Sequence, residues 1–185
     1  MQPLNLPTYK FRIKSNENKF AIFDIIRKKY VVLTPEEWVR QHLIHYLIEE
    51  KNYPISLIAV EKKVTVNKLT KRTDILIFNS FGLPEMIVEC KAPSIKINQD
   101  TFDQIARYNL KLDANFLIVS NGLEHFICKM DTENECYIFL ENIPTIQDNL
   151  NLTFEFKNLN TEHIIDKKNT EYKFTRKLHD CYAGS

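Results

Sequence analysis

The sequence predicts an α/β fold in which helices flank a mixed β-sheet. Two segments open with helix-start signals, and runs of β-branched and aromatic residues lie before, between and after them. The chain has 185 residues, enough for one domain with a sizeable core. Its composition, 44% hydrophobic and 26% charged, is that of an ordinary globular protein.

The first half of the chain is predicted to contain strand, helix and strand. Residues 20–33 are strand-like and are interrupted by a basic Arg-Lys-Lys cluster. A helix should occupy residues 34–51, because Thr34 is a favourable N-cap and a proline follows at the first helical position. Glu37, three residues after the cap, completes a capping box. Residues 55–66 are typical of the next strand.

The second half continues with a hairpin, a helix, a strand and another hairpin. Residues 72–93 predict two strands joined by a short turn. A helix is expected over residues 101–112, with Asp100 as its N-cap. Residues 115–122 are typical of a buried strand, and residues 125–141 of a further hairpin.

No linker divides the chain before about residue 150, since it has only three glycines and no Ser/Gly-rich stretch. We therefore expect one domain over residues 1–150 and a polar appendage of uncertain order over residues 151–185. No apolar run reaches the roughly 20 residues that span a bilayer, and the N-terminus lacks the apolar core of a secretory signal. A cytoplasmic protein without membrane contact is expected.

Neither zinc nor disulfides are suggested by the four cysteines, which are widely spaced and form no C-x-x-C pair. A net charge of +1 argues against coating nucleic acid by bulk electrostatics. Residues 61–72 are nevertheless basic, and their candidate DNA contacts are Lys62, Lys68, Lys71 and Arg72. An ordinary solvated face is the alternative for such a run.

The stretch IVECKAPS (87–94) carries two opposite charges inside a strand-like run. Because side chains alternate along a strand, Glu89 and Lys91 share one face and Cys90 points to the other. The preceding strand can set Asp74 beside Glu89. Two adjacent carboxylates repel unless a proton or cation intervenes, and Mg²⁺ is the usual ion for such oxygen ligands. On spacing alone, ion pairs at a sheet edge explain these charges equally well.

Five segments found in order along residues 34–122 carry a family resemblance: TPEEWVRQ (34–41), KRTDILIF (71–78), IVECKAP (87–93), TFDQIARYN (101–109) and VSNG (119–122). The set resembles the PD-(D/E)XK nuclease superfamily, and within it the N-terminal nuclease domain of type I restriction enzyme R subunits. A restriction-endonuclease-like sheet is implied. Thr73-Asp74 replaces the Pro-Asp step. No phosphate-loop motif is present, so any ATP-driven motor must lie on another chain.

The resemblance implies a metal site and a catalytic lysine. Asp74 and Glu89 would bind Mg²⁺, with Mn²⁺ as a substitute, together with the main-chain carbonyl of Cys90. Lys91 would orient or help deprotonate a metal-bound water, or stabilise charge on the phosphoryl group.

The family also uses an acid from its first helix, and here two acids are adjacent. At about 100° per residue, the inward stripe of the predicted helix consists of Val39, Leu43 and Leu47. Glu36 lies within this stripe, so we expect it in the catalytic and metal site. Glu37 is explained by the capping box. His42, which points away from the stripe, is expected at the surface.

Gln104 and Tyr108 lie four residues apart and share one helix side, which matches the family's Q-x-x-x-Y element at the catalytic site. Taken alone, the pair also fits an amphipathic helix with a half-buried tyrosine.

The favoured function is a Mg²⁺-dependent DNA endonuclease that serves restriction and defence. The alternative is a nuclease-fold module that binds DNA or a partner and needs a motor or specificity chain to cut. A homo-oligomer is compatible with both. A small structural protein with a surface ion-pair network is the least favoured reading.

Overall fold

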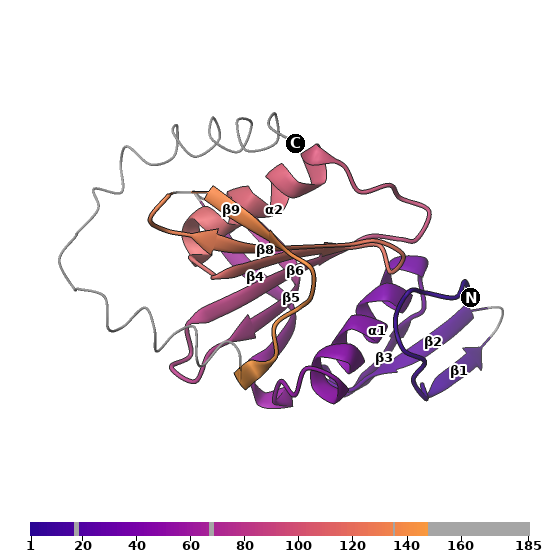
Figure 1. The fold of residues 1–185 in the computed structure, drawn as a ribbon. Coiled ribbons are helices and arrows are strands. Elements are labelled where there is room, and N and C mark those ends of the chain that lie inside the picture. The colour runs from indigo at the N-terminus through magenta and orange to yellow at the C-terminus, as the bar shows by residue number, and fades with distance from the viewer. Residues whose placement is uncertain (17–18, 67–68, 135, 148–185) are drawn as a thin grey trace.

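The computed structural model describes residues 1–16, 19–66, 69–134 and 136–147. Within these ranges the chain forms two β-sheets and two α-helices (Figure 1). The predicted α/β class with a mixed sheet is confirmed. The predicted appendage over residues 151–185 lies outside the described residues, so the division near residue 150 stays a prediction.

The N-terminal sheet is a three-stranded antiparallel meander in the order β1-β2-β3. Its strands are β1 (Ile13–Asn16), β2 (Lys19–Asp24) and β3 (Lys29–Val32). The basic cluster interrupts the strands as expected, because Arg27 lies in the turn between β2 and β3 and Lys28 adopts a positive φ of 52°. Strand β1 was not foreseen.

The larger sheet has the order β4-β5-β6-β7-β8-β9. Its strands are β4 (Ile58–Val66), β5 (Leu69–Phe78), β6 (Pro84–Cys90), β7 (Phe116–Ser120), β8 (His125–Asp131) and β9 (Cys136–Leu140). Strands β6 and β7 are parallel, and the other neighbours are antiparallel. A parallel pair needs a long crossover, which the segment containing α2 supplies.

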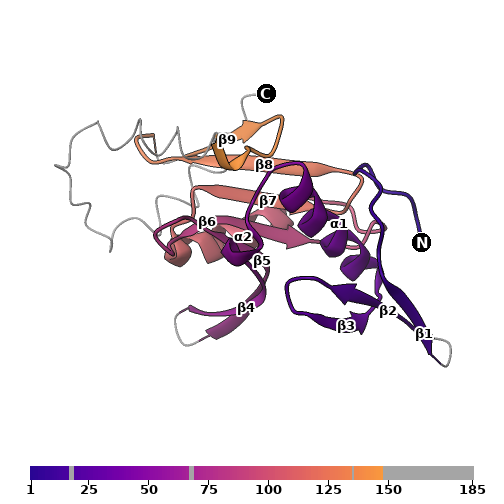
Figure 2. The ribbon, with the colours of Figure 1, turned by 90° about the horizontal axis from the view of Figure 1, so that it is seen from below.

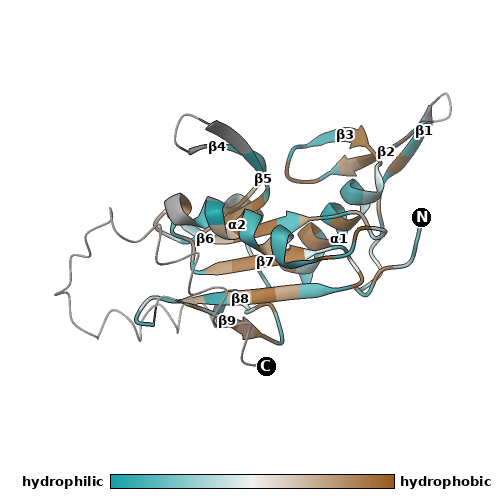
Figure 3. Ribbon diagram, turned by 90° about the horizontal axis from the view of Figure 1, so that it is seen from above, coloured by the Kyte–Doolittle hydropathy of each residue, from teal (hydrophilic) through white to brown (hydrophobic). Residues whose placement is uncertain are grey.

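Helices α1 (Pro35–Glu49) and α2 (Gln99–Leu112) cover opposite faces of the larger sheet (Figure 2). Alternate strand residues divide between two cores: Val88 packs with the α1 side, whereas Ile87 packs with the α2 side. All five residues of β7 are buried, as expected for a strand covered on both faces. The middle of β7 and β8 accordingly carries hydrophobic colours in Figure 3.

The helix boundaries test the capping predictions. Thr34 is the N-cap of α1, because its Oγ1 accepts a hydrogen bond from Glu37 N at 3.0 Å. The prediction for α2 is wrong: its N-cap is Asn98, whose Oδ1 accepts from Thr101 N at 3.1 Å. Asp100 lies inside the first turn, where a negative charge favours the helix dipole. Neither helix of the described ranges is long and apolar enough to cross a membrane.

Candidate active site

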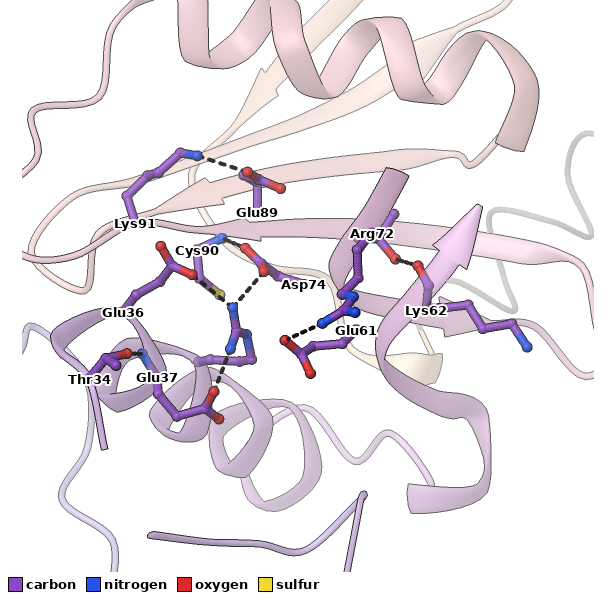
Figure 4. A network of polar contacts seen from close by, with 12 residues as sticks. Thr34, Glu36, Glu37, Glu61, Lys62, Arg72, Asp74, Glu89, Cys90 and Lys91 are labelled. Atoms are coloured by element: carbon purple, nitrogen blue, oxygen red, sulfur yellow. Dashed lines mark hydrogen bonds and ion pairs between the residues drawn. The ribbon is translucent and has the colours of Figure 1, made fainter. Parts of the chain in front are cut away.

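Strands β5 and β6 and the residue after β6 bring three predicted site residues together. Continuing the antiparallel register of these strands by one residue places Asp74 opposite Glu89. Asp74 Oδ2 accepts a hydrogen bond from the backbone N–H of Cys90 at 2.7 Å. Lys91 Nζ donates to Glu89 Oε1 at 2.8 Å. Figure 4 shows these side chains gathered around the end of β6.

The pKa values of Glu89 and Lys91 are shifted by burial and by the neighbouring charges. Burial is the main cause of the raised pKa of Glu89, and the negative charge of Asp74 raises it further. Burial alone would lower the pKa of Lys91, but its hydrogen bond and charge pairing with Glu89 raise the pKa above the ordinary value. The hydrogen bond to Glu89 thus favours the ammonium form of Lys91.

Arg40 of α1 is a central member of the cluster that the sequence analysis missed. Its Nη2 donates to Asp74 Oδ1 at 2.6 Å and to Glu36 Oε1 at 2.9 Å. Its Nη1 donates to Glu37 Oε2, and the residue is only 5% exposed. The spacing of the two acids, three and four residues before the arginine on one helix, was the available signal.

The two adjacent acids of α1 differ from the helical-face prediction. Glu36 lies on the side of the candidate site in Figure 4, but its side chain is 45% exposed, whereas that of Glu37 is 7% exposed. The carboxylate of Glu37 accepts from Arg27, and the backbone N–H of Thr34 donates instead to Val32 O. The predicted capping role of the Glu37 side chain is thus wrong, because buried cations compete for that carboxylate.

His42 is also buried rather than at the surface. Its ring lies 4.1 Å from the ring of Trp38 and 4.6 Å from that of Phe11, measured between centroids. Burial is the main cause of its lowered pKa. This histidine joins the N-terminal segment to α1 and has a packing role.

Three of the four predicted DNA contacts, Lys62, Lys71 and Arg72, belong to strands β4 and β5. Lys62 and Arg72 are exposed there, and Arg72 Nη1 pairs with Glu61 Oε1 at 3.2 Å. Lys68 lies outside the described residues, as does the side chain of Lys71. The exposed members are therefore available to a ligand, and one of them already has a weak ion-pair partner.

Gln104 and Tyr108 lie one turn apart on α2. This helix packs on the face of the larger sheet that carries Ile87, and Glu89 projects to the same face because it lies two residues further along β6. Gln104 is half-buried, and the side chain of Tyr108 is outside the described part of the chain. The two residues are thus on the helix that covers the Glu89 side of the sheet.

The side-chain donors of the candidate site are carboxylate oxygens, the type of ligand that a hard divalent cation takes. The ion pairs near the site form two groups. One is a network of five carboxylates and three arginines: Asp24, Glu36, Glu37, Glu61 and Asp74 with Arg27, Arg40 and Arg72. The other is the neighbouring pair of Glu89 with Lys91. When all are ionised, two negative charges are in excess. Among the described residues, no three His, Cys, Asp or Glu side chains are grouped to hold an ion by themselves. Mg²⁺ commonly uses one or two carboxylates and retains waters, so Asp74 and Glu89 would be sufficient side-chain ligands. Both oxygens of Asp74 already accept hydrogen bonds, one from Arg40 and one from the backbone N–H of Cys90.

The thiol of Cys90 does not belong to this donor set. It is fully buried in the α1-side core, and burial is the main cause of its strongly raised pKa. The main-chain carbonyl is the group of Cys90 that the metal prediction invokes, and it stays a prediction.

Comparisons with known proteins bear on the same region. A solved structure described as the fragment of a protein assigned as an HsdR subunit of a type I restriction enzyme from Vibrio vulnificus YJ016 has a TM-score of 0.52 and 19% identity. The match covers 70% of this chain and 27% of that one, and at this identity it establishes the fold. No curated protein gives a significant match. Residues 35–144, more than half of the chain, match the family described as type I restriction enzyme R protein N terminus (HSDR_N). The chain therefore belongs to this family of restriction-enzyme N-terminal domains.

Proposed function

We propose that the chain is a Mg²⁺-dependent deoxyribonuclease module of a type I restriction system, acting in defence against foreign DNA. The observation that carries the proposal is the convergence of Asp74, Glu89 and Lys91 at the end of β6. Family membership supports a restriction-enzyme role, and the excess of carboxylates supports a divalent cation.

Asp74 and Glu89 would hold Mg²⁺ with the carbonyl of Cys90, and Glu36 would complete the acidic side of the site. The bound ion would supply Lewis-acid stabilisation and acidify a bound water. Lys91, as an ammonium held by Glu89, would stabilise charge on the phosphoryl oxygens.

The remaining predicted residues would hold the substrate. Gln104 and Tyr108 would contact the site or the DNA backbone from α2. The cations Lys62, Lys68, Lys71 and Arg72 would contact phosphates along the β4–β5 hairpin. Mn²⁺ would substitute for Mg²⁺ because both ions accept carboxylate and water ligands.

A second candidate is a nuclease-fold module that binds DNA but cuts only with a separate motor or specificity chain. The observation in its favour is the ion pair between Arg40 and Asp74, which commits one carboxylate oxygen to a guanidinium. A metal would have to share Asp74 with this arginine or displace it. Binding of DNA or of another chain would then be needed to rearrange the site.

Plasmid cleavage separates the two candidates. The purified chain is incubated with supercoiled DNA and Mg²⁺ or Mn²⁺, with EDTA as the metal control. Lys91→Ala should lower the cleavage rate by about 10² to 10⁴, as is typical for electrostatic help of this kind. Lys96→Ala, which removes an exposed lysine five residues later, should leave the rate unchanged. Equal inactivity of wild type and Lys91→Ala, with DNA binding retained, would support the second candidate.

A further inference from the structure

The N-terminal sheet has one face against α1 and one face pointing away from it. Ile22 and Asp24 of β2 are fully buried, and Asp24 Oδ2 accepts a hydrogen bond from Gln41 of α1 at 2.9 Å. Alternate residues of β2 therefore point outward. The strand registers place the apolar Ala21 and Val32 on this outward face together with five further side chains. We call these five the outer basic face: Arg12, Lys14, Lys19, Phe23 and Tyr30.

Two cations of the outer basic face are held over aromatic rings. The guanidinium carbon of Arg12 lies 3.6 Å from the ring centroid of Phe23, and Lys14 Nζ lies 4.1 Å from that of Tyr30. The two rings pack edge to face with centroids 5.2 Å apart. Such cation–π contacts fix the position of the charges without neutralising them. Arg12 and Lys14 are both exposed, so these positioned charges face solvent.

The charge of this face is of one sign. Of the described residues that the strand registers place on this face, the charged ones are Arg12, Lys14 and Lys19, all cations. Within the described ranges neither Arg12 nor Lys14 forms an ion pair with a carboxylate. The chain as a whole has a net charge of only +1, so this local excess is not a consequence of a basic composition. A surface of this kind is complementary to a polyanion.

We propose that the outer basic face binds the sugar-phosphate backbone of DNA. Arg12 and Lys14 would contact phosphates as positioned cations, with Lys19 beside them. Because the rings of Phe23 and Tyr30 are already covered by cations, stacking of bases on them is disfavoured, and the contact should be independent of sequence. The inference takes from the proposed function only that DNA is the ligand.

The position of the sheet agrees with a second DNA contact. Figures 2 and 3 show the N-terminal sheet and the β4–β5 hairpin projecting from the same side of the larger sheet. The hairpin carries the exposed Lys62 and Arg72. Cations of two separate elements would then contact one DNA backbone. The sequence pattern indicated the hairpin and the basic cluster at residues 27–29, but not Arg12 and Lys14.

The test is DNA binding by fluorescence anisotropy, measured in EDTA on a Lys91→Ala background with a short labelled duplex of random sequence. The variant Arg12→Gln/Lys14→Gln removes both fixed cations. If each contacts one phosphate, the slope of log affinity against log salt should fall by about 1.8. The affinity ratio of parent to variant should then shrink about ten-fold between about 50 and 200 mM salt. Circular dichroism and thermal melting check that the variants are folded.

Lys51→Gln is the matched control, because Lys51 also lies over a tyrosine ring, with Nζ 5.4 Å from the centroid of Tyr46. It should change neither affinity nor slope. Arg12→Lys should retain most of the binding, and Lys14→Glu should weaken it more than Lys14→Gln, since charge is the proposed determinant.

Three results would overturn the inference. The first is that the parent protein does not bind DNA. The second is that Arg12→Gln/Lys14→Gln loses no more DNA affinity than Lys51→Gln. The third is that the double variant loses as much affinity for polyglutamate or anionic vesicles as for DNA, which would identify a general anion-binding surface. Binding and cleavage report separately on the two proposals. If the wild type cuts DNA but the double variant binds it as tightly as its parent, this inference alone is refuted. If the wild type is inactive but DNA binding depends on Arg12 and Lys14, only the nuclease proposal is refuted.

Discussion

Replacing Arg40 with glutamine should lower the free energy of unfolding by about 3 to 5 kcal/mol, the usual cost of removing one partner from a buried ion pair. The reason is the set of groups left behind. Asp74 and Glu37 are mostly buried, and each would lose a charge-assisted hydrogen bond. Glu36 would also lose its ion pair with Arg40, at less cost because its side chain is partly exposed. Burial alone would lower the pKa of Arg40, yet the charges of Asp74 and Glu37 raise it.

A surface arginine provides the comparison for this magnitude. Arg72 pairs with Glu61 at 3.2 Å, but its side chain is 54% exposed. Exposed pairs contribute about 0 to 1 kcal/mol, so Arg72→Gln should be almost neutral. In a domain of this size, each kcal/mol shifts the melting temperature by about 2 to 4 °C. The two variants should therefore differ clearly in a thermal scan.

The assay is thermal and urea unfolding followed by circular dichroism, with and without Mg²⁺. If the ion and Arg40 share Asp74, Mg²⁺ at 100 times its dissociation constant for Arg40→Gln should stabilise this variant by about 2.7 kcal/mol. The same concentration should stabilise the wild type less. A loss below about 1 kcal/mol for Arg40→Gln would refute the buried-network reasoning. Equal stabilisation of both proteins by Mg²⁺ would refute competition at Asp74.

Two further predictions concern stability. Gly122→Ala should destabilise the protein more than Gly82→Ala. Both glycines have a positive φ, which costs alanine about 1 to 2 kcal/mol. A Cβ at Gly122 would also lie 2.8 Å from a side-chain carbon of Leu4, whereas a Cβ at Gly82 would have no atom within 4 Å. Equal melting temperatures would contradict this. In urea unfolding, the losses of unfolding free energy caused by Arg27→Gln and Arg40→Gln should be non-additive by about 0.5 to 3 kcal/mol, because both arginines bind Glu37. Additive losses would mean that the two arginines act independently.

Features with a local cause could be predicted from the sequence. The start of α1 follows from Thr34, whose side chain accepts a hydrogen bond from a backbone N–H of the first turn, and from the proline after it, which has no N–H to pair. Both effects are independent of what the helix packs against. The hairpin of β5 and β6 follows from two β-rich runs joined by a turn, and its register then sets Asp74 beside Glu89. The order of helix, strands, helix and strand was sufficient for the fold class.

Features that depend on distant partners could not be predicted. The α1 face was assigned from apolar residues alone, so Arg40 was not considered for a buried position, although carboxylates from two elements pair with it. Glu37 has a locally favourable capping role, but stronger charged donors reach its carboxylate from the turn after β2. At α2, Asn98 and Asp100 are both good caps, and sequence alone does not separate positions two residues apart.

The buried network also explains why the N-terminal sheet matters to the candidate site. Arg27 Nε donates to Asp24 of β2, its Nη2 donates to Glu37, and Arg40 joins Glu37 to Asp74. Each carboxylate oxygen of Glu37 is thus bound to a different arginine. Arg40 bonds Glu37 through Nη1 and Asp74 through Nη2, and Gln41 also donates to Glu37 at 2.8 Å. The N-terminal sheet is therefore connected to Asp74 through Arg27, Glu37 and Arg40, while its outer face carries the cations proposed to bind DNA.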